Sequence, residues 1–444
     1  MSNSCNKQAE EPEWAAFAAL DWADQKHFWR LVAAESEQQQ QGELENTPEA
    51  VDVWATGLHA QFGGRPIAVC LEQSRGSLVC LLAKYPHLVL FPVHPKTAAD
   101  YRKTFCPSGA KSDPGDTASL LDLLLRHREQ LRPQRPDTVA TRLLQILVES
   151  RRMLVDEKTR QKNRLTACLK IYFPQMLQWF DLVDSPLVGA VLARWGTLME
   201  LRRAHPGTLR KFFHEHNCRD EERIRERIAA IGQAMPATED GAIVEGESRK
   251  ARALASVIAS LRDSIAEYDR RIAEVVAEHP EGSLFGSLPG AGPALVPRLI
   301  VAFGTLRERF ESAKEVQQLS GIAAVTERSG KSVQVHMRVA CPKFLRQTFH
   351  EFASHSIAQS EWAQVFYTAR RENRQKHHPA VRALAYRWIR IIYRCWKDRC
   401  PYDEQLYMRS LQRRGSPLIG AFAPTTEGEW KLTAGFSKFS AKNS

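Results

Sequence analysis

Several features that place a chain in a familiar class are absent from this one. None of the nine cysteines pairs with another in a CxxC motif, which excludes the usual structural zinc sites and gives no disulfide framework. No uninterrupted apolar run approaches the roughly 18 residues that a membrane-spanning helix needs. The segment Met1–Glu11 is polar and carries no apolar signal core. We therefore expect a cytoplasmic protein with free thiols and no membrane partner.

Acidic residues are the minority among the charged ones. The 444 residues include 62 Lys and Arg but only 51 Asp and Glu, for a net charge of +11. This excess favours a polyanionic partner such as nucleic acid, although composition alone also fits a globular protein that happens to be basic. The hydrophobic share of 43% is ordinary, and the length indicates two or three domains.

The N-terminal third, residues 14–135, is predicted to be an α/β domain that follows a disordered segment at 1–13. The glutamine-rich stretch at 35–47 is interpreted as a solvated loop. Because strands alternate with helices, we expect a partly parallel sheet whose ligand cleft lies at the carboxyl ends of its strands. The predicted strands lie at 15–21, 27–32, 66–72 and 88–93, and the predicted helices at 48–62 and 75–84.

Four acidic residues of this domain are placed to share a metal ion. Asp21 and Glu72 each close an apolar run, and Asp113 and Asp116 lie at i and i+3 where a helix begins. Carboxylates delivered into one cleft suit Mg²⁺, which prefers oxygen ligands and is often bound together with phosphates. A second interpretation stays open for the last two. Asp113 at the N-cap, Pro114 at N1 and Asp116 at N3 also make a good helix start.

The middle of the chain, residues 136–280, is predicted to be a helical linker with a coiled coil. A long charged helix is expected at 137–172 and further helices at 175–245. A coiled-coil strut or a dimerisation helix is indicated by a heptad seam, and packing within a larger helical domain is the alternative. The seam consists of Leu254, Ile258, Leu261, Ile265, Tyr268, Ile272 and Val275.

Residues 281–400 are predicted to form a compact C-terminal domain, with a loosely ordered tail at 401–444. Helices are expected at 295–303, 312–320, 342–357 and 379–395. Near its start, Pro289-Gly290-Ala291-Gly292-Pro293 resembles the turn of a helix-hairpin-helix. In such a turn, Gly290 and Gly292 would let backbone N–H groups approach a DNA phosphate. A Gly-Pro turn between domains is the alternative.

Two further segments of this domain carry polar chemistry. Ser329, between Arg328 and Gly330 with Lys331 next, is a candidate loop nucleophile in a cationic site, or else a solvent-exposed turn residue. A later stretch from Arg370 to Arg399 suits phosphate contact and base stacking, unless its aromatic side chains face the core. Its candidate phosphate contacts are Arg371, Arg374 and Arg382, and its interleaved aromatic residues are Tyr386, Trp388, Tyr393 and Trp396.

The order of these parts resembles one known family. The early Asp21 and Glu72 are followed by Lys111–Asp116 (KSDPGD), the heptad seam, Leu288–Pro293 (LPGAGP), Arg309–Lys314 (RFESAK) and Ser329-Gly330. This order is similar to that of the DEDD-type transposases of the insertion sequence 110 family, which are related to the Piv invertases and now called bridge recombinases. The family usually carries Thr where Ser112 stands here.

The resemblance implies an α/β RuvC-like (ribonuclease-H-like) N-terminal domain, coiled-coil helices and a mainly α C-terminal transposase domain. It implies that the four acids bind Mg²⁺ and that Ser329 attacks DNA to form a covalent phosphoserine. It also implies a structured noncoding guide (bridge) RNA that pairs with double-stranded target and donor DNA. Family members act as dimers or tetramers, at the nucleoid.

Two alternatives remain open on the residues themselves. In a hydrolytic RuvC-like nuclease or junction resolvase, water attacks the phosphate and Ser329 is only a loop residue. In a non-catalytic nucleic-acid-binding protein, the acids at Asp21 and Glu72 are dispensable.

Overall fold

The computed structural model describes residues 13–72, 76–105, 112–330, 332–424 and 430–432. The expected disordered segment at 1–13 lies almost wholly outside this part, and so does Lys331. The chain divides into two compact units, residues 1–136 and residues 137–444.

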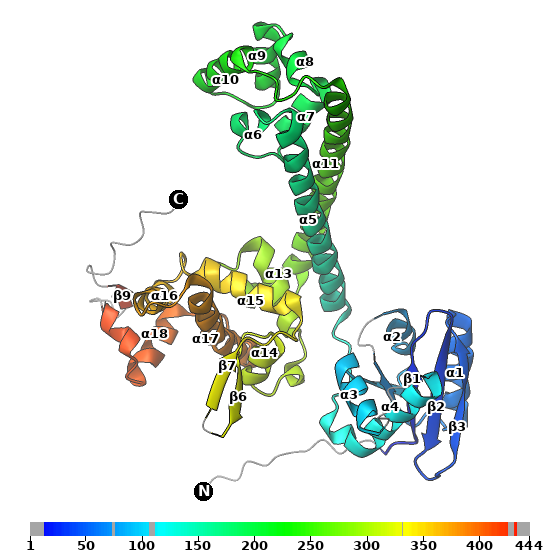
Figure 1. The fold of residues 1–444 in the computed structure, drawn as a ribbon. Coiled ribbons are helices and arrows are strands. Elements are labelled where there is room, and N and C mark those ends of the chain that lie inside the picture. The colour runs from blue at the N-terminus through cyan, green and yellow to red at the C-terminus, as the bar shows by residue number, and fades with distance from the viewer. Residues whose placement is uncertain (1–12, 73–75, 106–111, 331, 425–429, 433–444) are drawn as a thin grey trace. The chain divides into compact units, whose positions relative to one another are not determined.

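Unit 1 is built on a mixed sheet of five strands in the order β3-β2-β1-β4-β5 (Figure 1). The parallel strands are β1 (Ala16–Asp21), β4 (Ile67–Leu71) and β5 (Leu88–Pro92), and β2 (Lys26–Ala33) and β3 (Gln39–Glu45) add antiparallel neighbours at one side. Every residue of β4 is buried, as expected for an apolar run in the middle of a parallel sheet. This sheet with its helices confirms the ribonuclease-H-like α/β prediction.

The prediction of a solvated loop at 35–47 was wrong, because β3 lies within it. Gln39–Glu45 pairs with β2 as the edge strand of the sheet. An edge strand with exposed side chains needs no apolar residues, so its polar composition hid the backbone pairing. Gly42 lies opposite Trp29, whose indole atoms come within 3.1 Å of where a Cβ would stand.

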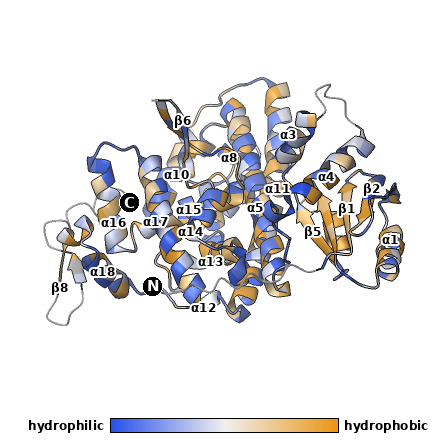
Figure 2. Ribbon diagram, turned by 90° about the horizontal axis from the view of Figure 1, so that it is seen from below, coloured by the Kyte–Doolittle hydropathy of each residue, from blue (hydrophilic) through white to orange (hydrophobic). Residues whose placement is uncertain are grey.

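Helices cover both faces of the sheet. One apolar cluster packs α1 (Pro48–Gln61) and α2 (Ser77–Leu82) on one face, and a second packs α3 (Pro95–Phe105) and α4 (Asp113–His127) on the other. Figure 2 shows the strands of the sheet as mostly hydrophobic, beside helices in which hydrophobic and hydrophilic residues alternate. A short 3₁₀ turn, η1 (Arg128–Gln130), follows α4. Helix α3 was not predicted from the sequence.

Two long antiparallel helices run through unit 2. They are α5 (Val139–Tyr172) and α11 (Gly241–Glu278), joined at one end by Thr141 Oγ1 and His279 Nε2 at 3.0 Å. Of the heptad seam, Ile258, Ile272 and Val275 are buried, while Leu261 and its neighbours in the middle are half-buried. The seam thus packs against a helix of the same chain, in an antiparallel pair.

Short helices form a separate core around the end of this pair where α5 stops and α11 begins. The core contains Phe173, Trp195 and Phe213 together with Leu169 and Ala251 of the long helices. The short helices are α6 (Met176–Trp179), α7 (Pro186–Arg194), α8 (Leu198–Arg202), α9 (Pro206–Glu215) and α10 (Glu221–Gln233).

The C-terminal helices form a third core at the other end of the pair, around the fully buried Trp362, Trp388 and Trp396. They are α12 (Gly282–Gly286), α13 (Gly292–Phe303), α14 (Ala313–Leu319), α15 (Lys343–Ser356), α16 (Glu361–Glu372), α17 (His377–Asp398) and α18 (Glu404–Arg413). The 3₁₀ turns η2 (Arg307–Arg309) and η3 (Pro417–Ala421) accompany them. The mainly helical prediction is confirmed.

The helical core continues past residue 400, where the sequence analysis began a loose tail. Met408 and Leu411 of α18 and Phe422 are buried in the same core as Trp396. Phe422 opens β8 (Phe422–Pro424), which pairs with β9 (Trp430–Leu432). Among the described residues, no helix is both long and apolar enough to cross a membrane.

Candidate active site

The start of α4 is capped by Ser112, whose hydroxyl accepts a hydrogen bond from the Gly115 N–H at 3.3 Å. The alternative in which Asp113 is the N-cap was therefore wrong, because the helix begins one residue earlier than that scheme requires. Asp113 is the first helical residue and is exposed, while Asp116 is buried one turn into the helix. Helix capping does not account for Asp116.

Asp116 is held by a cation from the neighbouring helix. Its side chain is 2% exposed and pairs with the guanidinium of Arg102, on the last turn of α3. A carboxylate this deeply buried has lost most of its hydration, so an adjacent positive charge offsets the cost of keeping it ionised.

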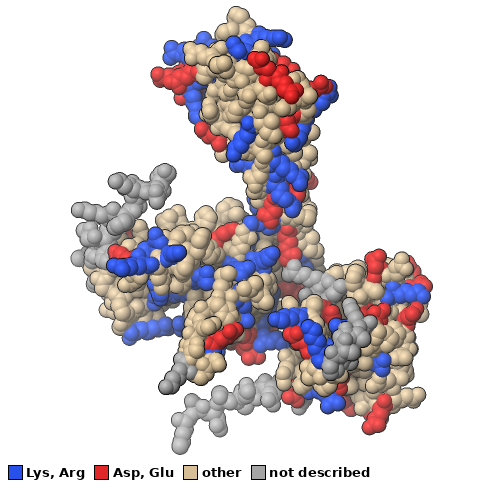
Figure 3. All heavy atoms as spheres, viewed as in Figure 1, with Lys and Arg blue, Asp and Glu red and all other residues tan. Residues whose placement is uncertain are grey.

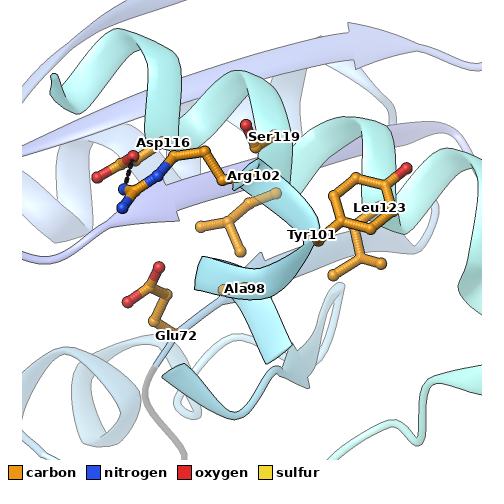
Figure 4. A pocket seen from close by; sticks show the side chains of 8 residues that line it. Glu72, Ala98, Tyr101, Arg102, Asp116, Ser119 and Leu123 are labelled. Carbon is orange, nitrogen blue, oxygen red and sulfur yellow. Dashed lines mark hydrogen bonds and ion pairs between the residues drawn. The ribbon is translucent and has the colours of Figure 1, made fainter. Parts of the chain in front are cut away.

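Glu72 and Asp116 line one pocket (Figure 4). The Glu72 carboxylate points toward the guanidinium of Arg102 from the side opposite Asp116. Ala98, Tyr101 and Arg102 of α3 and Ser119, Leu120 and Leu123 of α4 complete the lining. Two of the four predicted acids therefore line one pocket, although Glu72 follows β4 and Asp116 lies in α4.

Asp21 belongs to the same edge of the sheet. Strands β1 and β4 are parallel with Leu20 opposite Leu71, so Asp21 and Glu72 each lie one residue beyond this pair. Asp21 is two residues after Ala19 on the same strand, so both side chains point to the same face of the sheet. The Ala19 side chain packs on the face covered by α3 and α4. Asp21 thus comes to the carboxyl edge on the side of Asp116.

The acids at this edge of the sheet fit a divalent cation in their chemistry. Carboxylate oxygens are the ligands that Mg²⁺ prefers, and the pocket already accommodates the positive charge of Arg102. Within the described ranges, no three His, Cys, Asp or Glu side chains are drawn together closely enough to hold a metal. Asp113 lies apart on the exposed first turn of α4.

Tyr101 fixes α3 on α4. Its hydroxyl donates to Asp122 Oδ2 at 2.7 Å, and burial together with this bond raises the pKa of Tyr101 to about 12. Burial also acts to raise the pKa of Asp122, but hydrogen bonds from Arg126 and Tyr101 outweigh it and lower that pKa. This hydrogen bond links α3 to α4 at the residue next to Arg102. Tyr101 and Arg102 were not predicted from the sequence, because no helix was expected at α3, although Pro95 after an apolar strand is a helix-start signal.

Ser329 lies at the tip of a β-hairpin, where the sequence analysis expected a loop. Strands β6 (Val325–Ser329) and β7 (Ser332–His336) pair so that Ser329 faces Ser332 across the turn, and Gly330 has φ +56°. A two-residue hairpin turn favours such positive φ values, which explains the glycine. All described residues of the tip are exposed.

The register corrects one part of the serine prediction. Because side chains alternate along a strand, Ser329 shares a face with Glu327, and Arg328 points to the opposite face with Val333. His336 is also on the serine's face, with its Nε2 3.5 Å from Glu327 Oε1. Arg328 therefore does not flank the Ser329 hydroxyl, and Lys331 lies outside the described residues.

The root of this hairpin is closely packed. Gly321 has φ +69°, and a Cβ added there would lie 2.3 Å from Cys341 Sγ. On the other side, Arg346 of α15 donates to the Arg338 carbonyl at 3.2 Å. The tip that carries Ser329 is thus presented on a base that packing holds in place.

The turn at Gly290 joins α12 to α13 within the C-terminal helical core and not between domains. Gly290 has φ +79°, and an added Cβ would lie 3.0 Å from backbone atoms of His355 and Ser356. Close packing against α15 therefore accounts for Gly290. At Gly292, φ is +52° and an added Cβ would meet no atom within 4 Å. Only Gly292 stays open to a ligand.

The aromatic residues of the basic segment mostly serve the core, which corrects the prediction that they stack on bases. Trp388 Nε1 donates to Ser356 Oγ at 2.8 Å and Trp396 Nε1 to the Gly304 carbonyl at 2.7 Å, and both rings are fully buried. Tyr393 donates to the Glu311 carbonyl at 2.6 Å. Tyr386 is exposed.

The cations of the same segment remain at the surface. Arg371 and Arg374 are exposed and Arg382 is half-buried. Figure 3 shows Lys and Arg side chains gathered over the region of α15–α18. A surface of this kind favours contact with a phosphate backbone over base stacking.

Comparison with known proteins agrees with this geometry. A transposase family model of the IS110 DEDD type matches residues 18–174, and a model described as Transposase IS116/IS110/IS902 family matches residues 282–368. The mini-circle putative transposase for IS117 of Streptomyces coelicolor is 25% identical over 431 residues, which cover 93% of this chain and 100% of the relative.

Two further relatives come from other insertion elements. The uncharacterized 42 kDa protein of insertion element IS900 of Mycobacterium paratuberculosis is 26% identical and aligns over 79% of this chain and 84% of its own. The uncharacterized 43.6 kDa protein of insertion element IS110 of Streptomyces coelicolor is 23% identical over 78% and 82%, respectively.

Proposed function

Because the chain belongs to the IS110 family of DEDD transposases, we propose that it moves its insertion sequence by Mg²⁺-dependent, RNA-guided DNA strand exchange with Ser329 as the nucleophile. Membership in this family makes the protein a DNA-binding and DNA-processing enzyme. The observation that carries the proposal is the meeting of Glu72 and Asp116 in one pocket at the carboxyl edge of the sheet.

Glu72, Asp116 and Asp21 would hold the metal, with Asp113 the fourth candidate ligand. Bound there, Mg²⁺ would stabilise negative charge on the scissile phosphate and on the attacking and leaving oxygens. The protein's own part is to place the carboxylates on rigid elements, a strand end for Asp21 and Glu72 and a helix for Asp116.

Ser329 would attack the phosphorus of the DNA backbone through its hydroxyl oxygen. A serine–phosphate bond forms, the bond from phosphorus to one deoxyribose oxygen breaks, and the serine proton is lost while the leaving oxygen gains one. Attack by another DNA hydroxyl on the phosphoserine then restores the serine and rejoins DNA without an external energy source. The exposed hairpin tip and its packed root support this role, since the hydroxyl is accessible and its base is held.

The acids and the serine belong to different units of the chain. The proposed chemistry requires both, and we propose that the protein acts as a homo-oligomer, a dimer or a tetramer. Arg371, Arg374, Arg382 and the open turn at Gly292 are the proposed contacts to nucleic-acid backbone. As the family resemblance implies, the proposed sequence choice rests on base pairing by a structured noncoding guide RNA, and the protein would recognise that RNA by shape.

Trapping of a covalent protein–DNA adduct tests the nucleophile. The full chain, its guide RNA and end-labelled donor and target DNA are incubated with Mg²⁺ and denatured. We expect labelled protein with the wild type and none with Ser329→Ala. Ser332→Ala is the matched control, because Ser332 faces Ser329 on the same side of the hairpin and is equally exposed. Normal cleavage by Ser329→Ala would instead support the hydrolytic nuclease.

A further inference from the structure

Arg102 is the cation of the acidic pocket. It pairs with Asp116, and Glu72 points toward the same guanidinium (Figure 4). The Arg102 side chain is only 19% exposed, in contrast with Arg126 on α4, whose side chain is 69% exposed and pairs with Asp122. The acids at this edge of the sheet therefore already have a built-in positive partner.

A metal ion and this guanidinium compete for the same carboxylate. A metal ion bound to Asp116 uses the same carboxylate oxygen lone pairs that accept the hydrogen bond from Arg102. The two positive charges also repel each other strongly, because the pocket is largely buried. Removing the positive charge of Arg102 should therefore favour the binding of a metal ion to Asp116. The Tyr101–Asp122 hydrogen bond of 2.7 Å links α3 to α4 independently of Arg102, so this contact remains when the Arg102 side chain moves away from Asp116.

We propose that Arg102 is an internal counter-ion that keeps Asp116 paired in the metal-free protein and is displaced when a divalent cation binds. The inference rests on the metal site of the proposed function and adds a positioning residue to it. Arg102 stabilises the metal-free fold and weakens metal affinity, so the site is closed by an ion pair until a metal opens it.

The test measures metal binding directly. Mn²⁺ is titrated into the full chain without nucleic acid, and free Mn²⁺ is followed by electron paramagnetic resonance. We expect Arg102→Gln to bind Mn²⁺ about three- to tenfold more tightly than the wild type, which corresponds to about 0.7–1.4 kcal/mol. Its metal-free form should unfold at a lower temperature, and Mn²⁺ should raise that temperature by more than in the wild type.

Two further variants make the result decisive. Arg102→Lys keeps the charge but loses the planar fork, so its Mn²⁺ affinity should fall between those of the wild type and Arg102→Gln. It carries the test if Arg102→Gln does not fold. Arg126→Gln removes an exposed arginine of the same domain and should leave Mn²⁺ affinity unchanged.

Unchanged or weaker Mn²⁺ binding by the Arg102 variants overturns the inference and makes Arg102 a purely structural partner. Asp116→Asn separates this outcome from a failure of the proposed function. If Asp116→Asn abolishes Mn²⁺ binding while the Arg102 variants do not tighten it, the metal site stands and only the inference fails. If Asp116→Asn leaves Mn²⁺ binding intact, the proposed metal site and the inference fail together.

Discussion

Arg307 and Glu281 form a buried ion pair, in which Nη2 of the arginine lies 2.7 and 2.9 Å from the two carboxylate oxygens. Their side chains are 11% and 9% exposed, and the guanidinium lies 4.9 Å from the ring centre of Trp396. The pair connects the short loop after α11 to the start of η2. It therefore links the end of α11 to the C-terminal core.

Breaking this pair should destabilise unit 2. Glu281→Ala leaves Arg307 buried without its carboxylate, which should cost about 3–5 kcal/mol of unfolding free energy. Glu245→Ala is the control, because its partner Arg249 is exposed and the pair should contribute about 0.5 kcal/mol or less. Urea unfolding followed by circular dichroism measures both, and equal losses would contradict the assignment.

Removing the acids of the pocket should abolish DNA cleavage without preventing DNA binding. Glu72→Gln and Asp116→Asn should each lower the cleavage rate on the order of a hundredfold or more, since each removes charge at the proposed metal. Glu49→Gln, an exposed acid in the first turn of α1, should be unaffected. Cleavage is followed on labelled DNA with Mg²⁺, and binding by gel shift in Ca²⁺. Full cleavage activity of both pocket variants would contradict a catalytic metal site at Glu72 and Asp116.

Gly290 should matter through packing. Gly290→Ala places a Cβ against backbone of α15 and at a positive φ, so we expect a loss of about 1–2 kcal/mol or more. Gly286→Ala is the control, because nothing lies within 4 Å of its added Cβ and its φ is not positive. Thermal unfolding compares them. A stable Gly290→Ala with weakened DNA binding would restore the phosphate-binding interpretation of this glycine.

The exposed arginines should contribute salt-dependent affinity. Arg371→Ala and Arg374→Asn should each weaken nucleic-acid binding and reduce the slope of log affinity against log salt by about one. Asn is chosen at 374 because that residue has φ +60°, which Asn tolerates. Arg249→Ala on α11 provides a control of equal charge. Binding is measured by fluorescence anisotropy from low to moderate salt, and unchanged slopes would remove these residues from the interface.

Much of the fold could be predicted because it depends on local patterns. The buried run of β4, the long helix α5 and the heptad seam of α11 each carry their periodicity in the sequence. Strand β3 and helix α3 escaped prediction, because an edge strand needs no apolar residues and α3 buries only Ala98. Both are stabilised by contacts with neighbouring elements, β3 by pairing with β2 and α3 by its contacts with α4.

The candidate site residues could be identified from the sequence, but the directions of their side chains could not. Residue type and position at strand ends picked out Asp21 and Glu72, and the motif order picked out Asp116 and Ser329. Side-chain direction could not be read this way. The pairing of β6 with β7 places Arg328 and Ser329 on opposite faces of the hairpin. The Trp rings that alternate with arginines in α17 are buried in the C-terminal core.

The sequence by itself determined which side chains can bind metal and phosphate, because carboxylate, hydroxyl and guanidinium groups carry that chemistry wherever they lie. Only the tertiary structure decided that Glu72 and Asp116 meet and that Arg102 stands between them. The reason is that these residues come from a strand end and two helices, and only packing of α3 and α4 on one face of the sheet brings them within reach of one another.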